Sequence, residues 1–145
     1  MKVPFVDFRN AIQTNRQEIL DALTRVLDSG NVILGSETSS FEDEFAGFCG
    51  AKHCVGVGNG LDALSLTLRA AGIKQGDEVI VPSQTFIASW LAVSHVGAIP
   101  VAVEIDPQTY TLDPNRIEAA LTERTRAIMP VHLFGHMSDM DAIMD

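Results

Sequence analysis

Residues 56–64 read Gly-Val-Gly-Asn-Gly-Leu-Asp-Ala-Leu, a glycine-rich turn that leads directly into a segment with helical periodicity. The short apolar run 54–57 in front of the turn predicts a β-strand, and residues 61–71 behind it predict an α-helix. Asn59 is a favourable N-cap for this helix. Asp62 follows three positions later, so its carboxylate can reach back to the Asn59 N–H in a capping-box arrangement. We therefore expect a strand, a tight turn and a helix in direct succession.

This turn suits a phosphate group, because a helix N-terminus points unpaired backbone N–H groups and the positive end of the helix dipole at one spot. The sequence predicts that the amides of Gly60, Leu61 and Asp62 face such an anion. A plain turn that binds nothing has the same spacing and stays open as an alternative. A dinucleotide site is disfavoured, since it would need an acidic residue at the end of the second strand, where residues 80–83 read Ile-Val-Pro-Ser.

Beyond the turn, apolar runs of strand length alternate with helical segments, a rhythm that predicts an α/β fold with mostly parallel strands covered on both faces. The expected strands are residues 54–57, 78–81, 100–103 and 127–131, and the expected crossover helices are residues 61–71, 85–96 and 113–121. The first third instead shows only helical periodicity, with one helix ending at Ser29-Gly30 and another around residues 40–48. We therefore divide the chain into an amino-terminal helical arm, residues 1–52, and an α/β part, residues 53–145.

Composition and charge exclude several classes of partner. The chain has 145 residues, ten Lys and Arg against nineteen Asp and Glu, a net charge of −9, and no basic run that could hold a nucleic acid or an anionic membrane. Pro4 and Asp7 interrupt the start before an apolar leader can form, and no stretch approaches membrane-spanning length. We therefore expect no nucleic-acid partner, no membrane partner and a cytoplasmic location.

The loop that leaves the expected second strand holds a candidate ligand contact, Phe86. Open α/β sheets bind ligands on this side, so the ring of Phe86 can stack on a planar ligand. A phenylalanine buried in the core remains the alternative. Trp90, four residues on, is expected to pack in the core.

Metal chemistry is a weaker interpretation of this sequence. Side chains of ligand type gather after the last expected strand, at His132, His136, Asp139 and Asp141. Their spacing matches no standard zinc or di-metal motif, and Ser138 or Asp139 is better explained as a helix cap. Cys49 and Cys54 have no second pair with which to build a zinc site, and we expect both to be reduced. We therefore expect no metal site.

Several of these motifs carry a resemblance to a known family. They are residues 57–64, 76–82, 85–88, 130–135 and 139–141, together with residues 4–7, 29–30, 33–35 and 41–45 near the start. In order and spacing this set resembles the DegT/DnrJ/EryC1/StrS aminotransferases over nearly all of the chain. The resemblance implies a three-layer α/β/α large domain of the aspartate aminotransferase type, pyridoxal-phosphate fold type I, of which the chain holds an incomplete first part. In that fold the strands expected second, third and fourth lie together in the order three, two, four, and the first strand lies at the far edge.

The resemblance also implies cofactor, reaction and partners. The cofactor would be pyridoxal 5′-phosphate, and an amino group would move from an amino acid, usually glutamate, to a keto group on a nucleotide-linked sugar. Gly60, Leu61 and Asp62, next to Asn59, resemble the phosphate-binding turn, although leucine stands where threonine or serine is common. Phe86 resembles the aromatic residue that stacks on the pyridine ring. The full-length protein would be a homodimer, in which the loop 30–35 approaches the partner subunit's active site.

Family members place the aspartate against the pyridine nitrogen and the Schiff-base lysine further along than Asp145, so the resemblance implies no catalytic residue in this chain. Its lysines are Lys2, Lys52 and Lys74, and the last two precede expected strands, opposite the ligand side. We expect an amino-terminal portion of a transaminase that is inactive and unstable by itself. A dehydratase of the same family that uses the aminated cofactor remains an alternative, as does a non-catalytic fragment that binds a phosphate ligand.

Overall fold

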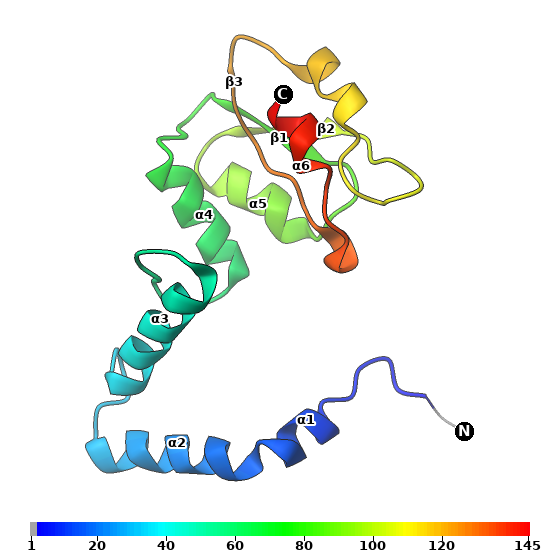
Figure 1. Ribbon diagram of the computed structural model, residues 1–145. Helices are drawn as coiled ribbons and strands as arrows, with labels where there is room; N and C mark the ends of the chain where they lie inside the picture. The colour runs from blue at the N-terminus through cyan, green and yellow to red at the C-terminus, as the bar shows by residue number, and fades with distance from the viewer. Residues whose placement is uncertain (1–2) are drawn as a thin grey trace. The chain divides into compact units, whose positions relative to one another are not determined.

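The computed structural model describes residues 3–145, and these fall into two compact units that divide between Gly56 and Val57 (Figure 1). The first unit contains the helices α1 (Arg9–Thr14), α2 (Arg16–Ser29) and α3 (Ser36–Cys49). The helical arm expected from periodicity is therefore formed. The domain boundary after residue 52 stays a prediction.

The helices of the first unit end where local chemistry ends them. α2 stops at Gly30 with φ of 67° and α3 stops at Gly50 with φ of 65°, a left-handed conformation that only glycine adopts without cost. An ion pair joins α2 to α3, with 2.6 Å between Arg25 Nε and Glu37 Oε1. Along α3, the rings of Phe41 and Phe45 stack with centroids 5.4 Å apart.

The second unit contains the parallel α/β fold. Its longer elements are α4 (Gly60–Ala70), β1 (Glu78–Pro82), α5 (Ile87–His95), β2 (Ile99–Val103), β3 (Thr125–Ile128) and α6 (Met140–Met144). The 3₁₀ turns η1 (Pro114–Arg116) and η2 (Glu118–Ala120) precede β3, and η3 (Leu133–Gly135) follows it. No helix within residues 3–145 combines the length and the apolar character needed to cross a membrane.

The sheet has the order β2-β1-β3, and both pairings are parallel. This is the order expected for the second to fourth strands of the aspartate aminotransferase type of fold. β1 is the central strand, and all five of its residues are buried because it has a neighbour on each edge and a core on each face. Val79 and Val81 pack on one face with α4 and α5, while Ile80 packs on the other with Leu112 and Ile117.

A buried carboxylate anchors the start of β1. Glu78 accepts a hydrogen bond from Thr122 Oγ1 at 2.5 Å, one from Arg124 Nε at 2.9 Å and a further one from the Arg124 Nη2 group. These bonds lie beside a β-bulge, where the pairing with β3 shifts between Glu78 and Val79. Hydrogen bonds from Thr122 and then from Arg124 hold the pKa of Glu78 below its ordinary value.

Two expected elements are not formed as predicted. Residues 54–57 form no strand, because a strand needs a ladder partner and none of β1, β2 and β3 pairs with them. Residues 113–121 form η1 and η2 rather than one α-helix. Their backbone bonds span three residues, from Ile117 N to Pro114 O at 3.2 Å and from Ala120 N to Ile117 O at 2.9 Å. The buried side chain of Ile117 fixes this tight path on the sheet.

Candidate active site

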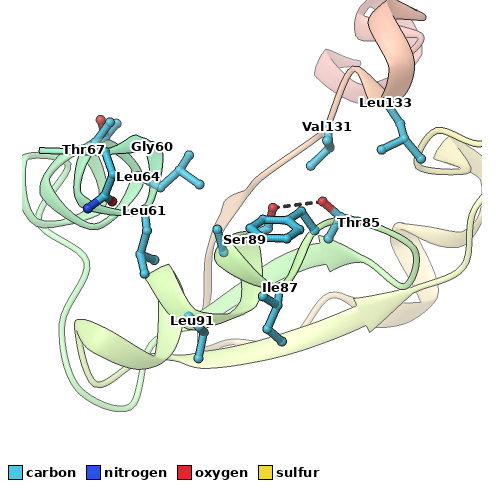
Figure 2. Close-up of a pocket in the computed structure, with 14 residues that line it drawn as sticks. Gly60, Leu61, Leu64, Thr67, Thr85, Ile87, Ser89, Leu91, Val131 and Leu133 are labelled. Carbon is cyan, nitrogen blue, oxygen red and sulfur yellow. Dashed lines mark hydrogen bonds between the residues drawn. The ribbon is translucent and has the colours of Figure 1, made fainter. Parts of the chain in front are cut away.

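A cavity of about 770 Å³ opens in the second unit at the carboxyl end of the parallel sheet (Figure 2). Its walls come from α4 and its cap Asn59, from the first half of α5, from Thr85 and Phe86 after β1, and from Val131 and Leu133 after β3. This is the end at which open α/β sheets bind ligands. Of the 14 described residues that line it, none carries a charge and most are apolar.

Asn59 caps α4, as the sequence predicts. Its backbone is extended, with φ of −168°, and its Oδ1 accepts a hydrogen bond from the Asp62 N–H at 2.9 Å. The Asp62 carboxylate in turn accepts from Asn59 Nδ2 at 2.9 Å, and not from the Asn59 backbone N–H that a capping box would use. A Cβ atom on Gly58 would lie 2.9 Å from this carboxylate, so a larger residue there would displace the Asp62 side chain.

The reciprocal bonds change the expected phosphate cradle. The Asp62 amide is already bonded to Asn59, and Asp62 is not among the residues that line the cavity. Gly60 and Leu61 do line it, and their amides occupy the first turn of α4, where no carbonyl of the helix can accept from them. The structure therefore leaves two amides of the predicted three for an anion, and Asp62 acts by orienting Asn59.

A second helix begins at the same cavity. α5 starts at Ile87, and the first-turn residues Ile87 and Ala88 line the cavity together with those of α4. The positive ends of two helix dipoles therefore meet at one neutral cavity, which favours a negatively charged group there. Sequence reasoning noted a helix start near Phe86 but missed this convergence, because the packing of α4 against α5 cannot be seen from local spacing.

Phe86 is the N-cap residue of α5, lines the cavity and is 76% exposed. The alternative of a core phenylalanine is therefore wrong. Trp90, in contrast, is partly buried and packs against the core of Val79, Val81 and Ala92, as expected. The helical spacing of Phe86 and Trp90 does not place them in one environment, because Phe86 precedes the helix.

Two hydroxyl groups lie at the start of α5. Thr85 Oγ1 and Ser89 Oγ lie 3.0 Å apart, and both residues line the cavity (Figure 2). Ser89 is only 6% exposed. Sequence reasoning did not single out either residue, although their i, i+4 spacing across a helix start is a readable signal for such a pair.

Hydrogen bonds also fix the segment after β3. The Ser138 N–H donates to His132 Nδ1 at 3.1 Å, and Ser138 Oγ donates to the Val131 carbonyl at 3.2 Å. These bonds hold the chain on either side of Leu133, which lines the cavity. Of the two residues considered as the cap of α6, Asp139 has that role, since its Oδ1 accepts from the Ala142 N–H at 3.1 Å.

Among the described residues, the lysines and the ligand-type side chains do not line the cavity. Lys52 and Lys74 are exposed and do not line it, and Lys2 lies outside the described residues. Within residues 3–145, no three His, Cys, Asp or Glu side chains gather as a metal site would require. The expectation of no metal in the protein remains a prediction.

The cavity fits a flat, phosphorylated ring. Its apolar walls and the exposed face of Phe86 suit an aromatic ligand, and the unpaired amides of two helix starts suit a phosphate. Leu61 contributes its amide but no hydroxyl to such an anion. The residues present are therefore compatible with pyridoxal phosphate.

Known proteins share both the sequence and the structure. The model of the DegT/DnrJ/EryC1/StrS aminotransferase family matches residues 13–145. The chain is 56% identical over 144 residues to dTDP-3-amino-3,4,6-trideoxy-α-D-glucose transaminase of Streptomyces venezuelae, covering 99% of this chain and 38% of the relative. It is 55% identical to dTDP-3-amino-3,6-dideoxy-α-D-galactopyranose transaminase of Aneurinibacillus thermoaerophilus, covering 97% of this chain and 39% of that relative.

Solved structures give the same picture. DesV of S. venezuelae, in complex with a ketimine intermediate, matches with a TM-score of 0.95 and 56% identity over 99% of this chain and 38% of its own. NtdA of Bacillus subtilis, with bound cofactor PMP, matches with a TM-score of 0.92 and 38% identity over 98% of this chain and 33% of its own. The chain thus spans less than two fifths of the length of these relatives.

Proposed function

Because the chain belongs to the DegT/DnrJ/EryC1/StrS aminotransferase family, we propose that it forms the cofactor-binding amino-terminal part of a nucleotide-sugar aminotransferase. The cofactor is pyridoxal 5′-phosphate, the amino donor is glutamate, and the acceptor is a keto sugar linked to a nucleotide. The relatives that act on dTDP-linked sugars support this class of substrate.

One observation supports the proposal above the others: two helix N-termini and an exposed aromatic ring share one neutral cavity at the carboxyl end of the sheet. Gly60 and Leu61 would hold the phosphate through their amides, and Asn59 would keep α4 capped in that position. Phe86 would lie against the ring. When bound, pyridoxal phosphate supplies the electron sink for amino-group transfer.

The residues of this chain bind, orient and exclude water rather than react. Leu64, Leu91 and Val131 supply apolar walls, which lower the local dielectric constant and so strengthen each hydrogen bond to the phosphate. Transamination also needs a lysine beside the ring. Since no lysine among residues 3–145 lines the cavity, we propose that these residues alone do not catalyse transfer.

The assembly and the location remain proposals as well. We propose a homodimer for the full-length protein and a cytoplasmic location, as expected from the sequence. The dehydratase and the non-catalytic binding fragment remain alternatives, and no feature of the cavity favours either one.

A chimeric enzyme tests the function directly. In it, this chain replaces the matched 144 residues of the S. venezuelae transaminase. We expect the chimeric enzyme to bind pyridoxal phosphate, seen by its absorbance, and to transfer an amino group from glutamate to a dTDP-linked keto sugar. The 145-residue chain assayed alone should transfer none. A folded chimeric enzyme that binds no cofactor would contradict the proposal, and dehydration without transfer would favour the dehydratase.

Phe86→Ala in the chimeric enzyme tests the ring contact. Because the Phe86 side chain is largely exposed, its loss should weaken cofactor binding roughly three- to tenfold with little change in the melting midpoint. Tyr110→Ala is the matched control, since Tyr110 is also exposed and does not line the cavity. Equal cofactor affinity in the two variants would rule out stacking on Phe86.

A further inference from the structure

The hydroxyl groups of Thr85 and Ser89 form a pair inside the cavity. Their oxygens lie 3.0 Å apart, and either one can donate to the other. Thr85 precedes α5 and Ser89 lies in its first turn, so the rigid helix start fixes the position of both groups. In the described part of the chain, each hydroxyl has only the other as its hydrogen-bond partner.

The pair retains one hydroxyl proton that it can donate to a third group. Two hydroxyl groups carry two protons, and their mutual hydrogen bond uses one of them. The second proton therefore remains free to donate to a third group. With Ser89 only 6% exposed, water can satisfy that donor only through the cavity, so an acceptor placed in the cavity gains a hydrogen bond.

The other polar side chains that line the cavity, Asn59 and Thr67, lie on α4 or at its N-cap and not at the start of α5. Asn59 lies at the start of α4, where its Oδ1 accepts from the Asp62 amide and one of its two Nδ2 hydrogens is bonded to the Asp62 carboxylate. Thr67 lines the cavity two turns further along α4, away from the helix starts. Leu61 brings no hydroxyl at all. Among the residues that line the cavity, the Thr85 and Ser89 pair is thus the hydroxyl donor at the start of α5, where Figure 2 draws the hydrogen bond between the two groups.

We propose that Thr85 and Ser89 act as one positioning unit that donates a single hydrogen bond to an oxygen atom of the bound pyridoxal phosphate. The inference rests on the proposed function, because it needs that cofactor in this cavity. One hydroxyl donates to the cofactor. The second hydroxyl orients the first through the hydrogen bond between them. Loss of either hydroxyl therefore removes the same contact.

The experiment measures the dissociation constant of pyridoxal phosphate for variants of the chimeric enzyme. The variants are Thr85→Val, Ser89→Ala and the double substitution, with Thr85→Ser as the conservative rescue. We expect each single variant to bind roughly three- to tenfold more weakly, and the double variant to lose no more than a single one. Ser83→Ala is the matched control, since Ser83 Oγ donates to Glu104 at 2.9 Å and does not line the cavity.

Pyridoxal without its phosphate identifies the acceptor. An equal loss with pyridoxal assigns the hydrogen bond to the ring side, and a loss seen only with the phosphorylated form assigns it to the phosphate.

A purely structural role gives a different result. If the pair only stabilises the start of α5, Thr85→Val lowers the melting midpoint and leaves the dissociation constant unchanged, which overturns the proposal. If the losses of affinity in the two single variants multiply in the double variant, the two hydroxyl groups do not act as one unit. If the unmodified chimeric enzyme binds no cofactor, the proposed function itself fails. If it binds and the variants bind equally well, only this inference fails.

Discussion

The two units of the chain are built by different means. In the first unit, Ala46 is the buried apolar residue among those described, while Phe48 is 87% exposed and Leu27 is 73% exposed. In the second unit, Val79, Ile80 and Val81 are completely buried in consecutive positions of one strand. Local capping, one ion pair and ring stacking account for the first unit, whereas the second depends on contacts between segments far apart in sequence.

This difference indicates where stability resides. Most helical stability in proteins comes from packing an apolar face and not from helix propensity. α2 and α3 bury almost nothing in the chain described, so their local free energy of opening should be small. β1 should open only with the whole second unit.

Ile80→Ala tests this contrast with the largest expected effect. The substitution leaves a cavity between Val103, Leu112 and Ile117, and it should destabilise the second unit by about 2–5 kcal/mol. Leu27→Ala is the control in the first unit, where an exposed side chain should cost less than about 0.5 kcal/mol. Hydrogen–deuterium exchange of the chimeric enzyme reports both units in one sample. Similar losses in both variants would mean that the first unit is packed as firmly as the second.

Glu78→Gln tests the same contrast through charge, and it should destabilise the second unit less than Ile80→Ala does. Thr122 first and Arg124 second lower the pKa of Glu78, and Arg25 lowers that of Glu37 in the first unit. The Glu78 side chain is 5% exposed against 38% for Glu37, so solvent screens the second pair far more. We expect Glu78→Gln to lower the melting midpoint at neutral pH more than Glu37→Gln does.

The sign of the pH dependence follows from the direction of these shifts. A carboxyl group whose pKa is lowered on folding stabilises the protein at pH values above its pKa in the unfolded chain, which is 4.5 for Glu78. This stabilisation is lost as the pH falls through the lower pKa of the folded state. The difference in melting midpoint between Glu78→Gln and the unmodified protein should therefore be constant above pH 4.5 and shrink at lower pH. Melting curves across that range check it, and a difference that grows in acid would exclude the ion pair as its cause.

Local signals in the sequence predicted much of the second unit, and their failures have a common cause. The N-cap at Asn59 and the apolar run of β1 depend on neighbours a few residues away, and both were predicted correctly. The strand expected at residues 54–57 failed because pairing is not local. The free amide expected at Asp62 failed because the extended backbone of Asn59 turns its side chain toward it.

The candidate site shows the same limit. Phe86 and Gly60 could be identified from motif spacing and from the family resemblance, and both line the cavity. The convergence of the α4 and α5 starts and the pair of Thr85 and Ser89 were missed, since their importance arises only when α5 packs beside α4. Their roles toward a cofactor stay predictions until they are measured.

Asn59→Ala is the smallest change expected to separate local from long-range effects. Loss of the cap removes the bond to the Asp62 amide and should cost about 1 kcal/mol in the opening of α4. The exchange of β1 amides should change little, because Val79 and Val81 keep the rest of their core. Asn59→Asp keeps an acceptor oxygen for the Asp62 amide, but it adds a charge beside the Asp62 carboxylate, so it should restore α4 only in part. Equal loss of protection in α4 and β1 would show that the cap is coupled to the sheet, and the conformation of the turn before α4 would then depend on the whole second unit.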